Sequence, residues 1–300
     1  MLRAMFSSAA GRVVLAFAIL GSLATRAHAD EIFDDHVHLL SPANWPKAIT
    51  VETITPLLDA AKVNRAVLLS AAYRLTDEKK ARVENDFVAA QVAKDPKRFL
   101  GFCAVHVKQA WAVRELERCA KQHKFAGLKL HPRAQGLDLA NKKQARSMSA
   151  VLKRAGELGM VVLIDSNCRD LGACSDLINA ATEHPKTRVI LAHAMNLNFR
   201  QLATLAMART ENPDAGQNLY VDVAGIAPFF ADSPERESIA WYLRKFGIGH
   251  VVFGSDFPVF TPKASLDALA KYGFTPAELT GIRGGNLARL FEEVRKELGK

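Results

Sequence analysis

The sequence lacks three motifs that would each assign a function directly. No Cys-x-x-Cys occurs, which argues against a zinc knuckle, and no Gly-x-Gly-x-x-Gly follows an early strand, which argues against a dinucleotide-binding sheet. The absence of Gly-x-Ser-x-Gly leaves a serine nucleophile without support. Domain boundaries, internal repeats and low-complexity segments are also missing from residues 30–300, so we expect a single domain there.

Basic residues do not gather in a run anywhere in the chain. The formal net charge is +9, and it falls by three to +6 when Arg3, Arg12 and Arg26 are left out. Because the remaining basic residues are spread along the predicted helices, the sequence does not predict nucleic-acid binding. A positive field would instead favour anionic small molecules as partners.

Long apolar runs are absent except near the N-terminus. Two arginines precede an apolar run at 13–23, and Ala27-His28-Ala29 forms a small-x-small cleavage site. This pattern is typical of a secretory signal peptide over residues 1–29, with cleavage after Ala29 and export to the periplasm or the medium. The run is too short to span a bilayer comfortably, so an uncleaved membrane anchor is the less favoured alternative.

Cysteine is scarce, with four residues in a chain of 300. In an oxidising compartment Cys168 and Cys174 could pair across the short loop between them. The alternative is four buried free thiols, which are common in protein cores. We favour the free thiols, because Cys103 and Cys119 lie on a predicted strand and a predicted helix without an evident partner.

Apolar segments and amphipathic segments alternate along the rest of the chain. The apolar segments predict strands at 31–38, 65–71, 99–106, 125–131, 160–165, 188–193, 219–224 and 250–255. The amphipathic segments predict helices at 52–63, 77–94, 109–123, 142–158, 170–183, 198–209 and 235–246, followed by 264–271 and 283–298. Eight strands alternating with helices predict a single (β/α)8 TIM barrel with C-terminal helices, with an open doubly wound sheet as the alternative.

Polar residues that end the predicted strands indicate the place of a site. Side chains at the carboxyl ends of barrel strands converge on one mouth, where TIM-barrel enzymes carry their chemistry. These residues are His36, His38, Arg74, His106, Lys129, His131, Asp165, His193, Asp222 and Asp256. His36 and His38 are two residues apart on one strand, so both imidazoles face the same side and suit a transition metal. The alternative is a pair of core histidines satisfied by hydrogen bonds.

Five motifs between about Glu31 and Glu293 resemble the amidohydrolase superfamily. They are Asp34-x-His36-x-His38, Gly127-Leu-Lys129-Leu-His131-Pro132, Val189-Ile-Leu-Ala-His193-Ala194, Val252-Phe-Gly-Ser-Asp256-Phe-Pro258 and Gly285-Asn286-Leu-Ala-Arg-Leu-Phe291. Their order is that of the amidohydrolase-related branch, which includes pyrone-dicarboxylate lactonase and aminocarboxymuconate-semialdehyde decarboxylase. The resemblance implies a TIM barrel, a small-molecule substrate and one divalent metal ion, zinc in the first place with manganese as the alternative.

The resemblance also implies roles for individual residues. His36, His38 and Asp256 would bind the metal, and Asp256 would take a proton from the attacking water. His193 would polarise the reacting group or orient that water. The family usually has a histidine ligand at the end of the fifth strand, whereas this chain has Asp165. Asp165 could complete the metal shell, could orient His193 or a ligand histidine, or could mark a loss of activity.

Lys129 and His131 lie on one face of the fourth predicted strand and are candidates for substrate binding. In some relatives a strand lysine is carbamylated and bridges two metals, while in others a basic residue here binds a substrate carboxylate. We favour the second role, because no second set of histidine ligands is evident. Lys129 could also be a charge partner for Asp165 or Asp34, and Arg74 could bind a substrate anion or lie in a solvated loop.

Together these features predict a metal-dependent hydrolase that cleaves a C–O or C–N bond in a lactone, ester or amide of a small substrate, which can carry a carboxylate. A non-oxidative decarboxylase on the same scaffold is the first alternative, because fold and metal ligands do not separate the two reactions. A degenerate barrel that binds a ligand without turnover is the second. The loops at 41–50 and 227–234 carry aromatic residues, which predict a hydrophobic lid: Trp45, Phe229 and Phe230.

Overall fold

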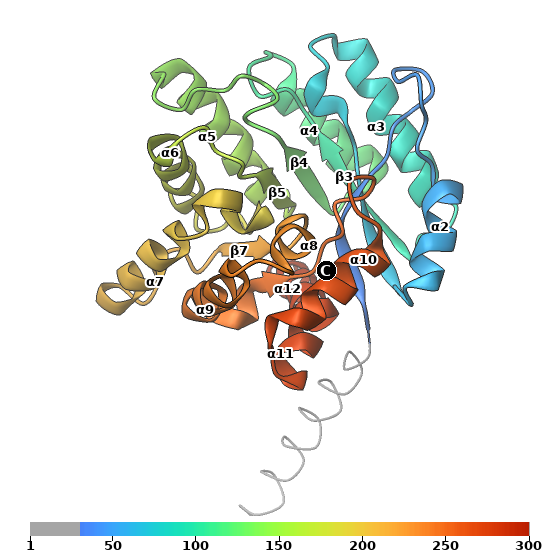
Figure 1. The fold of residues 1–300 in the computed structure, drawn as a ribbon. Coiled ribbons are helices and arrows are strands. Elements are labelled where there is room, and N and C mark those ends of the chain that lie inside the picture. Colours follow the sequence, from blue (N-terminus) through green and yellow to red (C-terminus); the bar gives the residue numbers. More distant parts are fainter. Residues whose placement is uncertain (1–30, 300) are drawn as a thin grey trace, which may run out of the picture.

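Short apolar segments form eight parallel strands whose last residues reach the same end of a barrel (Figure 1). The computed structural model describes residues 31–299. The strands are β1 Phe33–His38, β2 Arg65–Leu69, β3 Phe99–Ala104, β4 Gly127–Leu130, β5 Val161–Asp165, β6 Val189–Ala192, β7 Leu219–Asp222 and β8 Val251–Val252. Each strand pairs with the next in chain order. The predicted (β/α)8 barrel is confirmed, while the predicted signal peptide and its cleavage site lie outside the described residues.

Backbone hydrogen bonds between the last strand region and the first close the barrel. The N–H of Asp35 donates to the carbonyl of Phe253, and the N–H of His38 donates to the carbonyl of Phe257, both at 2.9 Å. A parallel bridge between Val37 and Phe257 lies at the same seam. The first and last strand motifs, far apart in the chain, therefore lie side by side.

Helices follow the strands and surround the barrel (Figure 1). They are α2 Val51–Ala60, α3 Glu78–Val92, α4 Ala112–Arg118, α5 Lys142–Glu157, α6 Leu171–Thr182, α7 Gln201–Glu211, α8 Ile226–Phe230, α9 Glu235–Gly247, α10 Pro262–Leu269, α11 Pro276–Thr280 and α12 Asn286–Glu297. Short 3-10 and π segments connect them: η1 Ala72–Arg74, η2 Cys119–His123, η3 His193–Asn198, η4 Ile248–His250, η5 Ala270–Tyr272 and η6 Gly281–Gly285. Across residues 31–299, the helices are too short or too polar to cross a membrane.

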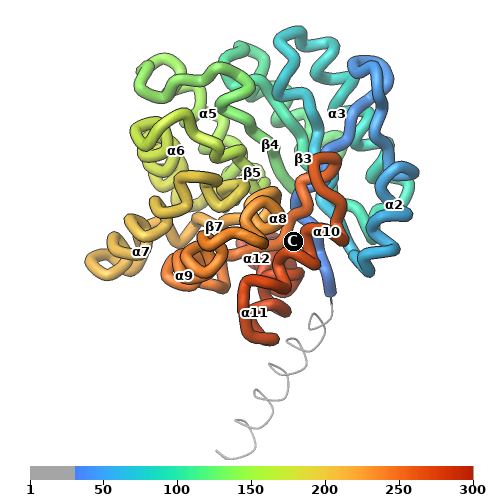
Figure 2. Tube along the Cα trace, viewed as in Figure 1, coloured from blue at the N-terminus to red at the C-terminus, as the bar shows by residue number. Residues whose placement is uncertain are grey.

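Two helices are additions to the predicted set. α8 and α11 have five residues each, too few to show a helical period in the sequence. α8 lies beside α10, near the carboxyl end of the barrel (Figure 2). This placement brings α8 to the mouth where the predicted site residues converge.

The last strand is shorter than predicted. β8 covers Val251–Val252, whereas the sequence predicts a strand at 250–255. Beyond β8 the chain passes so close to β1 that a Cβ on Gly254 would lie 2.7 Å from the Cβ of His36, an approach that only glycine permits. Asp256 then adopts a left-handed backbone conformation with φ of 60°, which ends the extended segment. The tight passage places Asp256 next to the histidines of β1.

Apolar side chains fill the barrel toward the amino-terminal ends of the strands, and α12 closes this end. The inner layer consists of Phe33, Val67, Leu69, Phe102, Val161, Leu163, Ile190, Ala192, Tyr220 and Val252. From α12, Leu287, Leu290, Phe291 and Val294 pack against this layer. The amide of Asn286 at the start of α12 donates to the carbonyls of Ile248 and Val251, which ties the helix to β8. Polar side chains are left to the carboxyl end.

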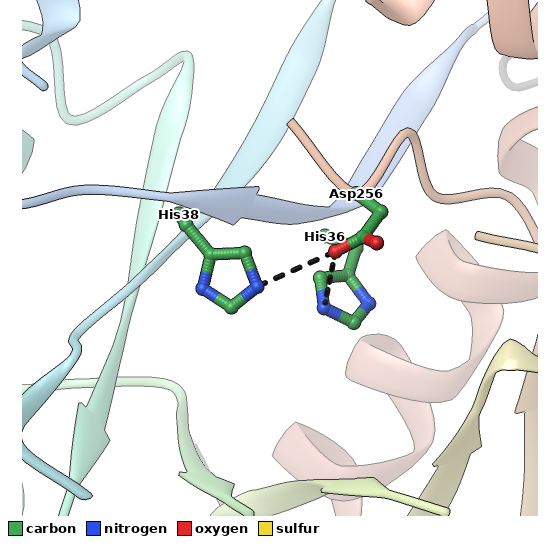
Figure 3. Close-up of side chains that lie close together, drawn as sticks. All are labelled: His36, His38 and Asp256. Carbon is green, nitrogen blue, oxygen red and sulfur yellow. Dashed lines mark ion pairs between the residues drawn. The ribbon is translucent and has the colours of Figure 1, made fainter. Parts of the chain in front are cut away.

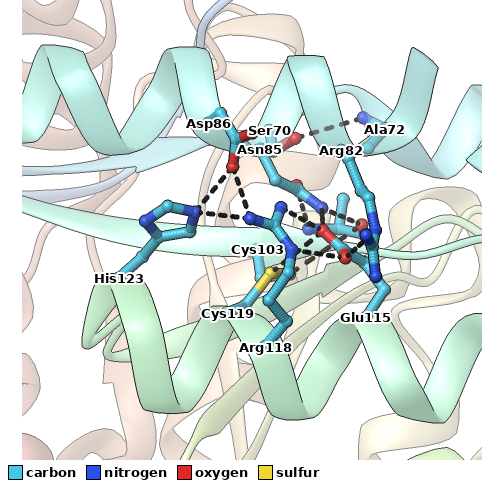
Figure 4. Close-up of a disulfide and its surroundings, with 11 residues drawn as sticks. Ser70, Ala72, Arg82, Asn85, Asp86, Cys103, Glu115, Arg118, Cys119 and His123 are labelled. Carbon is cyan, nitrogen blue, oxygen red and sulfur yellow. Dashed lines mark hydrogen bonds and ion pairs between the residues drawn. A yellow bond between two sulfur atoms is a disulfide. The ribbon is translucent and has the colours of Figure 1, made fainter. Parts of the chain in front are cut away.

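Both cysteine pairs form disulfides, so the expectation of four free thiols is wrong. Cys103 on β3 pairs with Cys119 at the start of η2, with a Cα–Cα distance of 6.1 Å (Figure 4). Cys168 pairs with Cys174, with a Cα–Cα distance of 5.3 Å. The first pair escaped prediction because α4 folds back onto the outside of the sheet and brings together residues 16 positions apart.

Candidate active site

The carboxyl end of the barrel opens into a cavity of about 840 Å³. Its lining includes six residues with predicted roles, whereas His36 and two other strand-end residues, His106 and Asp222, are buried and do not line it. These lining residues are His38, Lys129, His131, Asp165, His193 and Asp256. Side chains from β1, β4, β5, β6 and the segment after β8 therefore meet in one place, as a site at the mouth of a TIM barrel requires.

Two histidines of β1 and the aspartate after β8 form a group of potential metal ligands, called here the ligand group (Figure 3). Nε2 of His36 and Nε2 of His38 lie 3.5 and 3.4 Å from Oδ1 of Asp256. Zinc bonds of about 2.0–2.1 Å in a tetrahedral arrangement would place ligand atoms roughly 3.4 Å apart. The spacing and the donor atoms of the ligand group therefore fit one divalent cation.

Asp222 at the end of β7 fixes the orientation of His36. Its Oδ2 accepts a hydrogen bond from Nδ1 of His36 at 2.9 Å, and its Oδ1 accepts from the backbone N–H groups of His193 and Ala224 at 2.6 and 3.0 Å. With its hydrogen on Nδ1, His36 presents the lone pair of Nε2 to the ligand group. A second possible set of ligands, His36, His193 and Asp222, is less suited to a metal because these bonds already occupy both oxygens of Asp222.

Burial and neighbouring charges set the protonation of the ligand group. Burial lowers the pKa of His36 well below its usual value and also lowers the pKa of His38. Burial alone would raise the pKa of Asp256, but the hydrogen bond from His38 and the neighbouring His36 and His193 hold it well below its usual range. Neutral imidazoles and an ionised carboxylate are the forms that bind a metal, so the group is ready for one at neutral pH.

His193 lies beside the ligand group and is held in its protonated form. Its Nδ1 donates to the carbonyl of Ala224 at 2.9 Å, and its Nε2 lies 3.2 Å from Oδ2 of Asp165. Burial alone would lower the pKa of His193, but the hydrogen bond with Asp165 and the charges of Asp222 and Asp256 raise it to about 9. His193 therefore has a proton to give at neutral pH, whereas Asp256 can accept one.

The backbone that carries His193 has an uncommon conformation. His193, Ala194, Met195 and Asn196 all have positive φ, from 44° to 66°. Residues other than glycine rarely adopt this conformation and keep it only where the surroundings hold them, often at functional sites. Here the carboxylate of Asp222 binds the N–H of His193, so one residue orients both histidines.

Asp165 lies next to His193 and outside both sets of potential ligands. Its Oδ1 is 3.4 Å from Nδ1 of His131 and accepts a hydrogen bond from the N–H of Asn167 at 3.2 Å, while its Oδ2 faces His193. Burial alone would raise the pKa of Asp165, but the hydrogen bond from His193 and the nearby His131 hold it well below its usual range. Of the three roles predicted for Asp165, this arrangement favours the orientation of His193.

Lys129 is buried against the ligand group. Its Nζ lies 3.1 Å from Nε2 of His36, and burial lowers its pKa. Among residues 31–299 no carboxylate lies within 4.0 Å of Nζ, so the ion pair considered with Asp165 or Asp34 is not formed. Nζ of Lys129 instead contacts the atom that His36 presents to the ligand group.

Two arginines of the same cavity are better placed to meet a substrate anion. Arg74 and Arg133 line the cavity and are exposed, and neither forms an ion pair with a carboxylate of residues 31–299. The guanidinium carbon of Arg74 lies 5.6 Å from the ring centre of Tyr73. The sequence left the role of Arg74 open, and Arg133 was not predicted, although Arg133 directly follows the motif of the fourth strand.

The family model of the amidohydrolases matches residues 33–292. The chain therefore belongs to the amidohydrolase family, which confirms the resemblance carried by its five motifs and the expected amidohydrolase-type enzyme. A segment of 48 residues is 54% identical to gamma-resorcylate decarboxylase from Polaromonas sp. (strain JS666). That match covers 16% of this chain and 15% of the decarboxylase.

Solved structures with the same fold include enzymes of two reaction types. A dihydroxybenzoic acid decarboxylase from Polaromonas sp. JS666, with bound manganese and the inhibitor 2-nitroresorcinol, is 17% identical with a TM-score of 0.65 and covers 87% of this chain and 97% of its own. A probable 2-pyrone-4,6-dicarboxylic acid hydrolase from Acinetobacter baumannii, with citric acid bound, is 17% identical with a TM-score of 0.62 and covers 87% and 99%. At this identity the comparisons establish the fold.

Proposed function

We propose that the protein is a metal-dependent hydrolase that cleaves a C–O or C–N bond in a lactone, ester or amide of a small carboxylated substrate. The observation that carries this proposal is that Asp256 and His193 line one cavity beside the ligand group, where the pKa of Asp256 is lowered and that of His193 is raised to about 9. Hydrolysis needs a base for the water and an acid for the leaving group. Environments that move two pKa values apart assign these two tasks.

His36, His38 and Asp256 would hold one divalent cation. Two imidazoles and one carboxylate suit zinc, with manganese as the alternative. Manganese is the metal bound in the Polaromonas decarboxylase that shares the fold. When bound, the cation would polarise the reacting carbonyl and make water more acidic.

The remaining tasks fall to side chains of the cavity. Asp256 accepts the proton of the attacking water. Nδ1 of His193 keeps its hydrogen on the carbonyl of Ala224, and His193 gives the Nε2 proton, which it shares with Asp165, to the leaving oxygen or nitrogen. The substrate carboxylate lies at the mouth near Arg74 and Arg133, which are the cationic groups of the wall. The predicted substrate-binding pair, Lys129 and His131, lines the same cavity, and His131 is a neutral hydrogen-bonding group there because burial lowers its pKa to about 4.

A non-oxidative decarboxylase is the second candidate function. The 48-residue match to gamma-resorcylate decarboxylase is the observation that favours it. In that reaction a C–C bond breaks, carbon dioxide leaves and the remaining carbon takes a proton. His193 could supply that proton, as it does for the leaving group in hydrolysis. Hydrolysis comes first because only hydrolysis needs a base for a water molecule, the task that an ionised Asp256 can perform.

Export from the cytoplasm belongs to the same proposal. Residues 1–29 would be a signal peptide cleaved after Ala29, and the protein would act in the periplasm or the medium. The two disulfides support this location, because such bonds persist in oxidising compartments. Mass spectrometry of the protein from a periplasmic fraction should give an N-terminus at Asp30, and an intact N-terminus would contradict the proposal.

Metal content is the first test of the proposed site. We expect about one equivalent of zinc or manganese in the purified protein and a loss of that metal in the His36→Ala/His38→Ala variant. The variant His123→Ala serves as the control and should keep its metal, because His123 contacts Arg118 and Asp86 and does not line the cavity. A parent protein without metal, even after incubation with either ion, would contradict both the hydrolase and the decarboxylase.

The reaction type is tested by product analysis in water enriched in ¹⁸O. A panel of carboxylated lactones and aryl esters, with aromatic acids beside it, is offered to the metal-loaded protein. Hydrolysis places one ¹⁸O in the acid product, whereas decarboxylation releases carbon dioxide. Release of carbon dioxide without any hydrolysis would replace the first function by the second.

A further inference from the structure

Three exposed apolar side chains surround the opening of the active-site cavity. Among residues 31–299, seven large apolar side chains are exposed, and three of them line this cavity. They are Leu197 on η3, Phe229 on α8 and Val259 after β8, with exposed fractions of 69%, 69% and 65%. We call these three residues the apolar rim. Exposed apolar groups that gather at one opening are typical of a ligand or partner site, whereas isolated ones are common.

Each rim residue is held by the segment that carries a site residue. Leu197 follows His193 by four positions, directly after the stretch with positive φ. The N–H of Val259 donates to the carbonyl of Asp256 at 2.8 Å. The N–H of Phe229 donates to the carbonyl of Gly225 at 3.0 Å. The rim therefore has a fixed position relative to the ligand group.

Hydrogen bonds from Tyr272 also hold α8 in place. The hydroxyl of Tyr272 lies 3.2 Å from the carbonyl of Ile226 and 3.1 Å from that of Ala227, and both contacts hold the first turn of α8. Phe230 points into the core, where it is buried and packs on Phe199, with ring centres 6.5 Å apart. Of the three residues predicted for a lid, Trp45 and Phe229 line the cavity and Phe230 does not. Phe229 stays exposed because its neighbour Phe230 anchors the helix.

We propose that the apolar rim binds an aryl or branched alkyl group of the substrate, which extends out of the cavity while the reacting bond lies at Asp256 and His193. The inference rests on the proposed function for the position of the reacting bond. The cavity offers cationic groups, Arg74 and Arg133, together with the rim, so its ligand carries a carboxylate and a bulky apolar group. The substrate is the occupant because the rim is continuous with the cavity wall. A second copy of the chain seated on the rim would close the cavity.

Equilibrium binding tests this subsite without any turnover. The probe is 4-phenylbutyrate, with acetate as the carboxylate that lacks the apolar group, and calorimetry measures both dissociation constants for the purified protein. The variant is Leu197→Ser/Phe229→Ser/Val259→Ser. Its matched control is Val83→Ser/Met207→Ser/Trp241→Ser, which changes three apolar side chains that are exposed elsewhere, on α3, α7 and α9.

We expect the rim variant to bind 4-phenylbutyrate about tenfold more weakly, because it loses apolar contact area with the phenyl group. The control variant should stay within about twofold of the parent, and acetate should not distinguish the three proteins. Equal affinity of rim variant and parent for 4-phenylbutyrate, or no binding of this probe to the parent, would overturn the proposal.

Two further measurements separate the substrate subsite from a subunit interface and from a failure of the proposed function. Sedimentation analysis of parent and rim variant reports a subunit interface: a parent dimer that becomes a monomer in the rim variant would overturn the substrate subsite. Metal content is measured on the same samples. A protein without metal that still shows the tenfold difference would refute the proposed hydrolase and leave the apolar subsite in place.

Discussion

Lys129 donates a hydrogen bond to Nε2 of His36 at 3.1 Å, the atom that His36 presents to the ligand group. Nδ1 of the same imidazole is already bound to Asp222, so Nε2 is the acceptor of the pair. A metal ion and a lysine amine cannot use this lone pair together. The position of Lys129 therefore bears on metal affinity before any substrate is present.

We expect Lys129→Met to tighten zinc binding about tenfold, because it keeps most of the apolar part of the side chain while removing a competing donor and a like charge. Competition with a chelator of known zinc affinity measures the change, and Lys143→Met on the exposed start of α5 is the control. Weaker zinc binding by the Lys129→Met variant would contradict this expectation. It would instead indicate a lysine that takes part in the metal centre itself.

Asp222 holds His36 in the tautomer that a ligand needs. Asp222→Asn keeps the shape of the side chain. Its amide oxygen would stay with the N–H groups of His193 and Ala224, and its NH2 group would replace the oxygen that accepts from Nδ1 of His36. We expect zinc affinity to fall by about 10- to 100-fold, the usual effect of removing such a partner. Asp214→Asn, at an exposed position, should leave the affinity unchanged. An unchanged zinc affinity in the Asp222→Asn variant would contradict the role of Asp222 in orienting His36.

Asp165 should matter for turnover and not for metal content. In Asp165→Asn the metal should stay at about one equivalent, while kcat falls about 100-fold because His193 loses its orienting charge. Elemental analysis and kcat are measured on the same preparation. Loss of the metal would assign Asp165 to the ligands, the role that the present arrangement does not favour. Retention of full activity would contradict both roles.

Local sequence patterns were sufficient for the barrel and for the position of His36, His38 and Asp256 at its mouth, whereas their role as metal ligands came from the resemblance to a family. Alternation along β1 put His36 and His38 on one side, and a polar residue after an apolar segment placed Asp256 at the mouth. Features that depend on contacts between distant segments were missed. Asp222 meets His36 across 186 positions of the chain, and Cys103 meets Cys119 only because α4 folds back. No local pattern carries such contacts.

The apolar rim was missed in part for a related reason. Phe229 and Phe230 are adjacent aromatic residues, and the sequence predicted both for a lid. Which of the two faces the cavity depends on the start of α8 and on the packing of Phe230 against Phe199. Leu197 and Val259 lie in irregular segments where hydrophobic periodicity has no meaning. Their exposure became visible only with the fold.

The disulfide Cys103–Cys119 lies beside a buried group of charges between α3 and α4 (Figure 4). The carboxylate of Glu115 is fully buried, accepts two hydrogen bonds of 2.7 Å from Arg118, and accepts one of 2.9 Å from Asn85. Glu115→Ala would leave Arg118 without its main partner. We therefore expect the free energy of unfolding to fall by about 3–5 kcal/mol.

Denaturant unfolding with the disulfides intact measures this loss. Glu117→Ala, which removes a more exposed carboxylate on the same helix, should cost less than about 1 kcal/mol. A small and equal effect of the two substitutions would mean that the buried charges contribute no more than a surface ion pair.

Glu278 at the start of α11 provides a test of pH dependence away from the site. Its carboxylate accepts hydrogen bonds of 2.8 and 2.9 Å from Arg244 and one of 2.7 Å from the N–H of Thr275. The hydrogen bonds from Arg244 and Thr275 lower the pKa of Glu278 from 4.5 to about 2. Because the pKa is lower in the folded state, the charge stabilises the fold above pH 4.5, and this contribution is lost as the pH falls toward 2.

The pair lies near the surface, so we expect Glu278→Gln to lower the free energy of unfolding by about 0.5–1 kcal/mol at pH 7. The same substitution should have a smaller effect at pH 3, where the parent has lost part of the contribution. Urea unfolding of both proteins at the two pH values measures the difference, with Glu237→Gln as an exposed control. Glutamine can still accept the hydrogen bond from Thr275, so the substitution mainly removes the charge. An effect of equal size at both pH values would refute the role of the charge and would point to disturbed capping of α11.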